Sequence, residues 1–400
     1  MEVGHAPVRT LFLSSCVLGG GAGWSLYYLL KHLDRRRFDP LVVLPPGGIF
    51  EEKLQELGVP VVTPRLLHHR TAQLRFERRN PLTAAMSYGL NAWDSAHLVS
   101  ELVSIVGRER VRLIHCNNMM VKTVGAVAAQ RTGTPCVFHV RNLHDRLPKA
   151  LLYGNLARLP IVKRVVANSA ASARPYEQFV PQKVTVIHNG VDLDEYHPHA
   201  VPRGSFRRKA GIDSSAVVVG FTGLLTPRKG LEPLMHAAAR LLAGRRDLVF
   251  VAAGREPVGS MVPYRARYEA LAGDLGIADR FRFVGFHGDV RPIVLDCDVL
   301  VLPSLQEPFG RSVIEAMALG TAVIASRVGG IPEIIDHETH GLLVPPGDVD
   351  ALASAIGTLV DDPTRRRALA TAALARVRGH FDISMLSLAL QDVLLEAVAA

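Results

Sequence analysis

The chain has 400 residues, of which 48% are hydrophobic and 21% charged, a composition that excludes a disordered protein. A single core seldom grows to this length, so two domains of about 200 residues each are expected. The net charge of +9 lies in the first half: residues 1–200 hold 24 Lys and Arg against 15 Asp and Glu, whereas residues 201–400 hold 22 of each. This asymmetry suits an anionic partner or an acidic membrane surface, although solubility alone explains it equally well. Nucleic acid is disfavoured, because aromatic residues make up only 6% and are not interleaved with basic ones.

In the first half of the chain, short apolar and β-branched runs alternate with longer segments of helical period. This alternation is typical of βαβ units on a parallel sheet. The expected strands are Val8–Ser14, Pro40–Leu44, Val59–Thr63, Val111–Cys116, Pro135–Val140, Arg164–Asn168 and Lys183–His188. Residues 65–79 do not fit the alternation, since they carry five arginines against the single acid Glu77, with leucines and a phenylalanine between them. A solvated loop is the simpler interpretation, and a docking surface for a membrane or an acceptor is the alternative.

A second series of the same kind follows. Its expected strands are Ala216–Thr222, Leu248–Ala253, Phe281–Val284, Val299–Leu302 and Ala322–Ala325. The intervening residues 189–204 contain Pro198 and Pro202 among polar residues and suit an interdomain linker. We therefore predict one domain over 1–195, a second over 196–380, and a C-terminal helix over 381–400 that packs back at the domain junction.

Targeting and metal-binding patterns are not found in the sequence. The first apolar run, Val8–Leu13, is too short for a signal peptide, and no run reaches the roughly 18 apolar residues of a membrane-spanning helix. The four cysteines lack zinc-site spacing, and their scattered apolar surroundings predict reduced thiols in the core. We expect a cytoplasmic protein, with peripheral association at the inner face of a membrane as an added option.

The most informative stretch is residues 301–320, which read VLPSLQEPFGRSVIEAMALG. The preceding strand stops at Pro303, a turn follows, and a helix is expected from about Gly310 until Gly320 ends it. Glu307 then lies in the loop at the carboxyl edge of the sheet, where open α/β folds bind ligands, and Glu315 lies in the second turn of the helix. The start of such a helix attracts a diphosphate, while the two carboxylates can accept hydrogen bonds from sugar and ribose hydroxyls.

This stretch resembles the E-x7-E motif of the family 4 retaining glycosyltransferases of the GT-B fold, matched by Glu307 and Glu315. The resemblance extends over nearly the whole chain. It includes Gly19-Gly20-Gly21, Phe138-His139, residues 166–169, residues 186–192, Gly223 to Gly230 and residues 328–333. It implies two Rossmann-like parallel-sheet domains facing a central cleft, with the acceptor held by the first domain and a nucleotide sugar by the second.

The resemblance also assigns residues to roles. Lys229 neutralises the departing diphosphate, His139 touches the transferred sugar, and Glu307 is the third member of the catalytic set. The residues expected at the nucleotide sugar are Gly20, Gly21, Gly223, Arg228, Lys229, Phe309, Gly310, Arg311 and Glu315. The family places an arginine where this chain has Leu224, and either Arg228 compensates or leaving-group stabilisation is weaker. Gly20 and Gly21 do not belong to a dinucleotide fingerprint, because Trp24 and Leu26 stand where its last glycine is required.

The resemblance implies transfer with retention of configuration. We expect no metal ion or other cofactor, because cationic side chains can take the role of a metal at the departing diphosphate. A UDP-sugar is favoured over a GDP-sugar as donor. The expected acceptor is a glycan, a lipid-linked molecule or a small molecule, and an anionic acceptor is among the options. Two alternatives remain at this point. One is a sugar-nucleotide 2-epimerase of the same fold, and the other is a protein that binds nucleotide sugars without turning them over.

Overall fold

The computed structural model describes residues 6–16, 20–64, 81–143, 147–257 and 260–400, and for 81–92 and 147–148 it describes the backbone alone. The chain forms two compact units, Met1–His188 with Ser384–Ala400, and Asn189–Ile383. The basic segment 65–79 and Gly19 lie outside the described residues. No helix among those described is long and apolar enough to cross a membrane.

A parallel sheet of seven strands, in the order β3-β2-β1-β4-β5-β6-β7, forms the centre of the first unit. The strands are β1 Val8–Leu13, β2 Phe38–Val43, β3 Val61–Val62, β4 Leu113–Cys116, β5 Cys136–Val140, β6 Val162–Ala167 and β7 Val184–Val186. All seven fall within two residues of the expected runs. Their near-continuous apolar character follows from the helices that cover both faces of the sheet.

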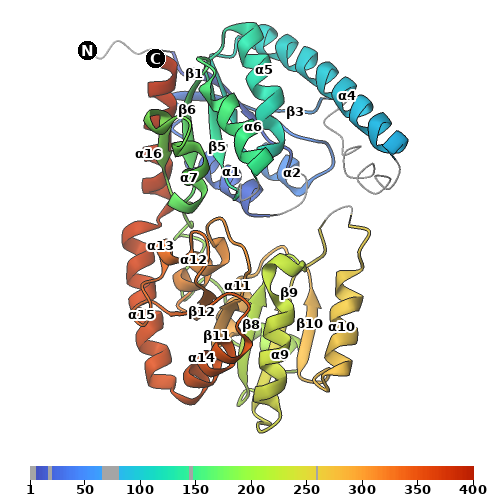
Figure 1. Cartoon of the computed structure of the whole chain (residues 1–400). Coiled ribbons are helices and arrows are strands. Elements are labelled where there is room, and N and C mark those ends of the chain that lie inside the picture. Colours follow the sequence, from blue (N-terminus) through green and yellow to red (C-terminus); the bar gives the residue numbers. More distant parts are fainter. Residues whose placement is uncertain (1–5, 17–19, 65–80, 144–146, 258–259) are drawn as a thin grey trace, which may run out of the picture. The chain divides into compact units, whose positions relative to one another are not determined.

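Helices of the first unit divide between the two faces of its sheet (Figure 1). One face is covered by α1 Gly21–Lys31, α2 Ile49–Glu56 and α16 Ile383–Ala399. The other is covered by α4 Pro81–Arg108, α5 Lys122–Thr132, α6 Leu147–Arg158 and α7 Ala170–Glu177, and the short 3-10 turns η1 Met119–Val121 and η2 Pro181–Lys183 lie in the connections.

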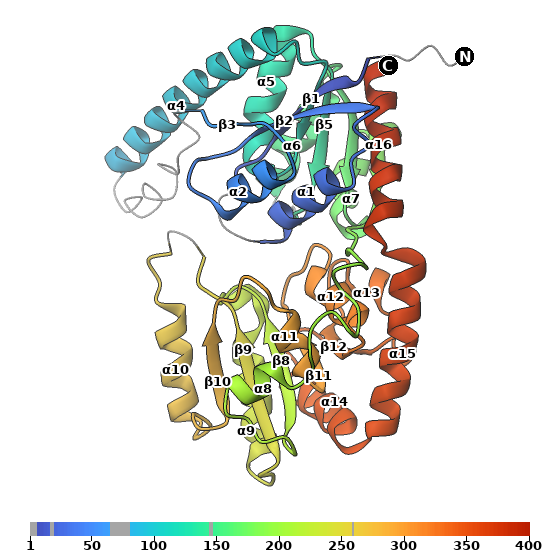
Figure 2. The same ribbon diagram turned by 180° about the vertical axis from the view of Figure 1, so that it is seen from behind.

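The C-terminal helix α16 belongs, from Ser384 on, to the first unit, and the expected packing of residues 381–400 at the domain junction stays a prediction. Its Leu390 and Leu394 are buried in the same core as α1 and α2, and Figure 2 shows it beside the first sheet. Polar contacts fix its register: the Gln391 side-chain oxygen accepts a 2.9 Å hydrogen bond from the Asp34 amide, and Arg37 lies 2.6 Å from Asp392. The apolar face expected of this segment therefore seals the first core.

The second unit is built on a six-stranded parallel sheet in the order β10-β9-β8-β11-β12-β13. Its strands are β8 Val217–Thr222, β9 Leu248–Ala253, β10 Phe281–Gly285, β11 Val299–Leu302, β12 Ala322–Ser326 and β13 Leu342–Val344. Its helices are α8 Ser205–Lys209, α9 Leu231–Leu242, α10 Tyr264–Asp274, α11 Arg291–Asp296, α12 Arg311–Ala318, α13 Ile331–Ile334, α14 Val349–Asp361 and α15 Pro363–His380. The sequence predicted five of the six strands, and β13 was missed.

Both sheets follow the doubly wound order, in which successive connections run first to one side of the starting strand and then to the other. The order reverses between β1 and β4 in the first unit and between β8 and β11 in the second. Open α/β sheets bind ligands outside the carboxyl ends of the strands at this point. We therefore expect the ligand-binding residues in the loops that follow these four strands.

Candidate functional site

Two charged side chains from the loops after β8 and β11 meet at the switch point of the second sheet. Lys229 ends the 3-10 turn η3 Pro227–Lys229, and its Nζ lies 2.5 Å from Oε2 of Glu307. Both side chains are largely buried, with 14% and 9% of their surfaces exposed, and the Ser304 hydroxyl lies 3.3 Å from the same Oε2. The structure thus brings together the two second-unit residues that the sequence singled out as catalytic.

Backbone contacts hold the two loops against each other. The Leu305 amide donates a 2.8 Å hydrogen bond to the Arg228 carbonyl, and Gly230 packs so closely on Pro303 that an added Cβ would lie 1.8 Å from its carbonyl oxygen. Gly230 has φ +70°, a left-handed conformation that glycine adopts at little cost. The glycine that follows Lys229 therefore sets the approach of the Lys229 loop to the Glu307 loop.

A third loop, after β12, supports Glu307 from the other side. The Gly330 amide donates a 3.2 Å hydrogen bond to the Glu307 carbonyl. Gly329, at φ +57°, leaves no space for a side chain, because a Cβ there would lie 1.7 Å from that same carbonyl oxygen. These contacts explain why the expected string from 328 to 333 accompanies the E-x7-E motif in the sequence.

The helix α12 begins beside this pair. Gly310, at φ +117°, is its N-cap residue, and the preceding Phe309 is buried in the core, so the chain turns sharply into the helix. Backbone N–H groups of the first turn have no partner within a helix and carry a partial positive charge. Glu315 is one turn further on, where its Oε1 accepts a 2.7 Å hydrogen bond from Nε of Arg311. Both residues were expected at the nucleotide sugar, and here they pair with each other.

Gly223 and Arg228, both expected at the phosphates, differ in how closely the surrounding chain packs on them. Gly223 follows β8 directly, and Gly254 approaches it so closely that a Cβ on Gly254 would lie 1.8 Å from the Gly223 carbonyl oxygen. Arg228 is exposed, and its carbonyl, rather than its guanidinium, connects it to the Glu307 loop. Leu224, which stands in place of the family arginine, is half-buried.

A cavity of about 640 Å³ at the same edge of the sheet was not predicted from the sequence. It is lined by residues that follow β8, β9 and β10 and by the start of α10. The Arg255 guanidinium lies 5.0 Å from the centroid of the Phe286 ring, and both side chains line the cavity. The only available signal was positional, since Gly254-Arg255 and Gly285-Phe286 end neighbouring parallel strands and must emerge at one edge.

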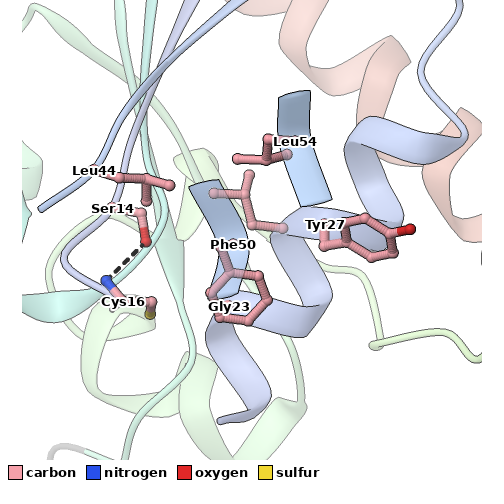
Figure 3. A pocket seen from close by; sticks show the side chains of 8 residues that line it. Ser14, Cys16, Gly23, Tyr27, Leu44, Phe50 and Leu54 are labelled. Atoms are coloured by element: carbon pink, nitrogen blue, oxygen red, sulfur yellow. Dashed lines mark hydrogen bonds between the residues drawn. The ribbon is translucent and has the colours of Figure 1, made fainter. Parts of the chain in front are cut away.

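In the first unit, the Gly-rich turn forms the start of α1. Gly20, at φ +116°, is the N-cap residue, and Gly21 is the first residue of the helix. Figure 3 shows an apolar pocket behind this turn, lined by Gly23, Phe50 and Leu54 among others. It has no room for a water molecule, so it is a packing defect and not a ligand site. The residues of α1 that line this pocket belong to the face of the helix that packs on α2.

His139 is the next-to-last residue of β5 and is buried with His115, the next-to-last residue of the neighbouring strand β4. The His139 Nδ1 lies 3.2 Å from Nε2 of His115 and 3.3 Å from a guanidinium nitrogen of Arg141. Burial, followed by the charge of Arg141, lowers the pKa of His115 to about 3. Burial, Arg141, His115 and Lys122 together hold the pKa of His139 well below its usual value. Both rings are therefore neutral in the physiological range.

No group of three or more His, Cys, Asp or Glu side chains suited to a metal ion occurs among the residues that the structure describes. The four cysteines are free thiols, as expected, and three are buried.

Comparison with known proteins gives two family matches. The model of the glycosyl transferases group 1 matches residues 202–376, and that of glycosyltransferase family 4 matches residues 19–195. A D-inositol 3-phosphate glycosyltransferase of Saccharomonospora viridis is 33% identical over 309 residues, covering 72% of this chain and 70% of that protein. One of Thermobispora bispora is 31% identical over 310 residues, with 72% and 71% covered.

Solved structures agree in fold. Anabaena HepE, determined in complex with UDP and glucose and with UDP-glucose, matches with a TM-score of 0.80 and 27% identity over 97% of this chain and 99% of that one. The sucrose-phosphate synthase of Thermosynechococcus elongatus matches with a TM-score of 0.79 and 21% identity over 98% and 99% of the two chains. At that identity the second likeness is one of fold alone.

Proposed function

The chain belongs to the family 4, group 1 glycosyltransferases, and from that premise we propose that it transfers a sugar from a UDP-sugar to an anionic acceptor with retention of configuration. The single observation that carries the proposal is the meeting of Lys229 and Glu307 at the switch point of the second sheet, beside the start of α12. A cation, a helix N-terminus and a hydroxyl-binding carboxylate are the groups that a nucleoside diphosphate sugar requires.

Lys229 and α12 serve the diphosphate in this proposal. The bond that breaks joins the anomeric carbon to a phosphate oxygen, so negative charge grows on the leaving group. A lysine ammonium and oriented backbone N–H groups stabilise that charge without reorganising, and such charge-assisted hydrogen bonds contribute about 1.5–3 kcal/mol each. Arg228 lies next to Lys229 and supplies a second cation in place of the arginine missing at Leu224.

Glu307 serves the sugar. Its carboxylate is held by Lys229 and Ser304, and its backbone is held by Gly330, so it is preorganised to accept hydrogen bonds from sugar hydroxyls. Glu315 accepts from the ribose hydroxyls while it remains fixed by Arg311. On the family resemblance alone, we assign His139 of the first unit as a contact of the transferred sugar.

The 640 Å³ cavity suits the nucleoside half of the donor. Its volume is in the range of small-molecule sites, and the Phe286 ring, which is exposed, offers a surface on which a flat base can stack. The preference for uridine over guanosine draws support from HepE, the 27% identical neighbour determined with UDP-glucose.

An anionic acceptor is supported by two independent observations. The positive charge of the chain is concentrated in its first 200 residues, with 24 basic against 15 acidic side chains. The relatives at 31–33% identity are named for the phosphorylated polyol D-inositol 3-phosphate. The same positive charge supports a cytoplasmic protein that associates peripherally with an anionic membrane. Sedimentation of the protein with anionic vesicles, at low and at high salt, tests this association.

Incubation with a panel of nucleotide sugars, with and without phosphorylated polyols, tests the proposal. A transferase releases nucleoside diphosphate and forms a glycosylated product only when both substrates are present. Isomerisation of the donor alone would instead indicate the epimerase, and donor binding with no turnover by any acceptor would indicate a non-catalytic protein. Analysis of the product anomer by NMR tests retention.

A further inference from the structure

The arrangement around His139 fixes which of its ring nitrogens carries the hydrogen. A guanidinium group only donates hydrogen bonds, and Arg141 lies 3.3 Å from Nδ1 of His139. That nitrogen therefore accepts, and the hydrogen of the neutral ring is on Nε2. His115 shares the same acceptor through its Nε2 at 3.2 Å, so this nitrogen of His115 must donate.

In this form of His139, the donor nitrogen has no acceptor in the part of the chain that the structure describes. Nε2 of His139 is buried and has no hydrogen-bond partner among the residues described. A buried donor without a partner is costly, because it has lost its hydrogen bonds to water, and a ligand oxygen can relieve that cost. The feature is thus a donor prepared for a ligand, rather than a histidine satisfied by the core.

Arg141 is itself held by a chain of contacts that leads to the start of α1. Its Nε donates a 3.2 Å hydrogen bond to Oδ1 of Asn117. The Asn117 amide nitrogen in turn donates to the Ala22 carbonyl at 3.0 Å and lies 3.3 Å from the Ser14 hydroxyl. The loops after β1, β4 and β5 therefore share one buried network at the switch point of the first sheet.

We propose that His115 and Arg141 are positioning residues that hold His139 as the neutral Nε2–H form, so that it donates a hydrogen bond to a hydroxyl oxygen of the sugar substrate. The identity of that oxygen rests on the proposed function, whereas the tautomer does not. The low pKa of each histidine agrees with this assignment, because a second hydrogen on Nδ1 of His139 would face two donors, Arg141 and His115, with the Lys122 ammonium also nearby.

The tautomer is measured by long-range proton–nitrogen NMR on the full chain labelled with nitrogen-15 in its imidazole rings. The His139 signals are assigned by their loss in His139→Gln. We expect an unprotonated Nδ1 and a protonated Nε2 throughout pH 6 to 8. A His139 protonated on Nδ1, or on both nitrogens at pH 7, would overturn the proposal whether or not the protein transfers sugar.

Two matched pairs test the positioning roles. His115→Gln retains an N–H near the place of Nε2, whereas His115→Phe removes it, and Arg141→Lys retains a cationic donor that Arg141→Met lacks. We expect His115→Phe and Arg141→Met to shift His139 toward a tautomer mixture and to lower kcat about tenfold with little change in the donor KM. In His115→Gln and Arg141→Lys, the His139 tautomer and kcat should both stay close to their wild-type values. An unchanged tautomer in folded His115→Phe and Arg141→Met would contradict the roles assigned.

The two failures are distinguishable. If the wild-type tautomer is as expected but no nucleotide sugar and acceptor react, the proposed function fails and the tautomer assignment stands. If transfer occurs while His139 carries its hydrogen on Nδ1, the positioning proposal fails and the proposed function stands.

Discussion

Nζ of Lys229 and Oε2 of Glu307 lie 2.5 Å apart although 78 residues separate them in the chain. One residue follows β8 and the other follows β11, the two strands between which the order of the second sheet reverses. Neither side chain is exposed enough for water to screen the pair fully, so each depends on the other for its position.

Replacement of either partner should impair transfer. Lys229→Ala removes the cation that stabilises the leaving diphosphate, and Glu307→Ala removes the acceptor for sugar hydroxyls. Each should lower kcat/KM at least about tenfold, which corresponds to roughly 1.4 kcal/mol of transition-state stabilisation. The exposed replacements Lys209→Ala and Glu338→Ala serve as controls with the same chemistry. Wild-type rates for either site variant would refute its role.

The close approach of Gly329 to the Glu307 carbonyl allows a prediction about the backbone of the Glu307 loop. Gly329→Ala places a Cβ against the Glu307 carbonyl at a positive φ, so the Glu307 loop must move and both stability and transfer should fall. Gly244→Ala is the matched control, because a Cβ there meets nothing within 4 Å. Thermal unfolding and transfer rates of the two variants check the prediction, and similar behaviour of both would contradict it.

Lys122 gives a pH-dependent prediction in the first unit. Its buried ammonium donates a 2.9 Å hydrogen bond to the Tyr176 hydroxyl and lies 5.0 Å from the centroid of that ring. Burial lowers the pKa of Lys122 from 10.5 to about 7. Between these values the unfolded chain binds a proton that the folded chain has released. This group should therefore make the free energy of unfolding rise with pH, by at most roughly 1.4 kcal/mol per unit.

Urea unfolding of wild type and Lys122→Met at pH 7, 8 and 9 measures this contribution. The wild type should gain stability relative to the variant as the pH rises, because all other groups titrate in both proteins. Lys209→Met, which changes an exposed lysine, should run parallel to wild type. Parallel curves for Lys122→Met as well would show that Lys122 keeps its ordinary pKa.

Removal of divalent metal should leave transfer intact, since Lys229, Arg228 and the start of α12 provide the positive charge that a metal ion would otherwise supply. Rates measured after exhaustive treatment with a chelator, and again with added manganese or magnesium, check this. Loss of activity that manganese restores would refute metal-independent catalysis.

The alternation of strands and helices could be predicted from the sequence. Parallel strands that are buried on both faces of a sheet consist of continuous runs of apolar residues, and such runs are easy to recognise. The GT-B fold and the family expected from Glu307 and Glu315 are confirmed. The missed strand, β13, has only three residues, too few to show a period. The apolar face of the last helix indicated that the helix packs, but it did not indicate on which core.

The family resemblance placed Lys229 and Glu307 in one catalytic set, and the structure brings their side chains into contact. It did not predict the pairing of Arg311 with Glu315 or the cavity beside Arg255 and Phe286. Both depend on loop conformation, which local propensity does not determine. The network of His115, Asn117 and Arg141 around His139 was equally hidden, because its members look like ordinary residues at strand ends.

Calorimetric titration of the protein with UDP-glucose tests the central claim, that the meeting point of Lys229, Glu307 and α12 binds the diphosphate sugar. We predict saturable binding to wild type and to Lys209→Ala, weakened about tenfold or more in Lys229→Ala, as expected for loss of a charge-assisted contact of at least roughly 1.4 kcal/mol. Equal affinity in wild type and Lys229→Ala, or no binding of any nucleotide sugar to the folded wild-type protein, would contradict it.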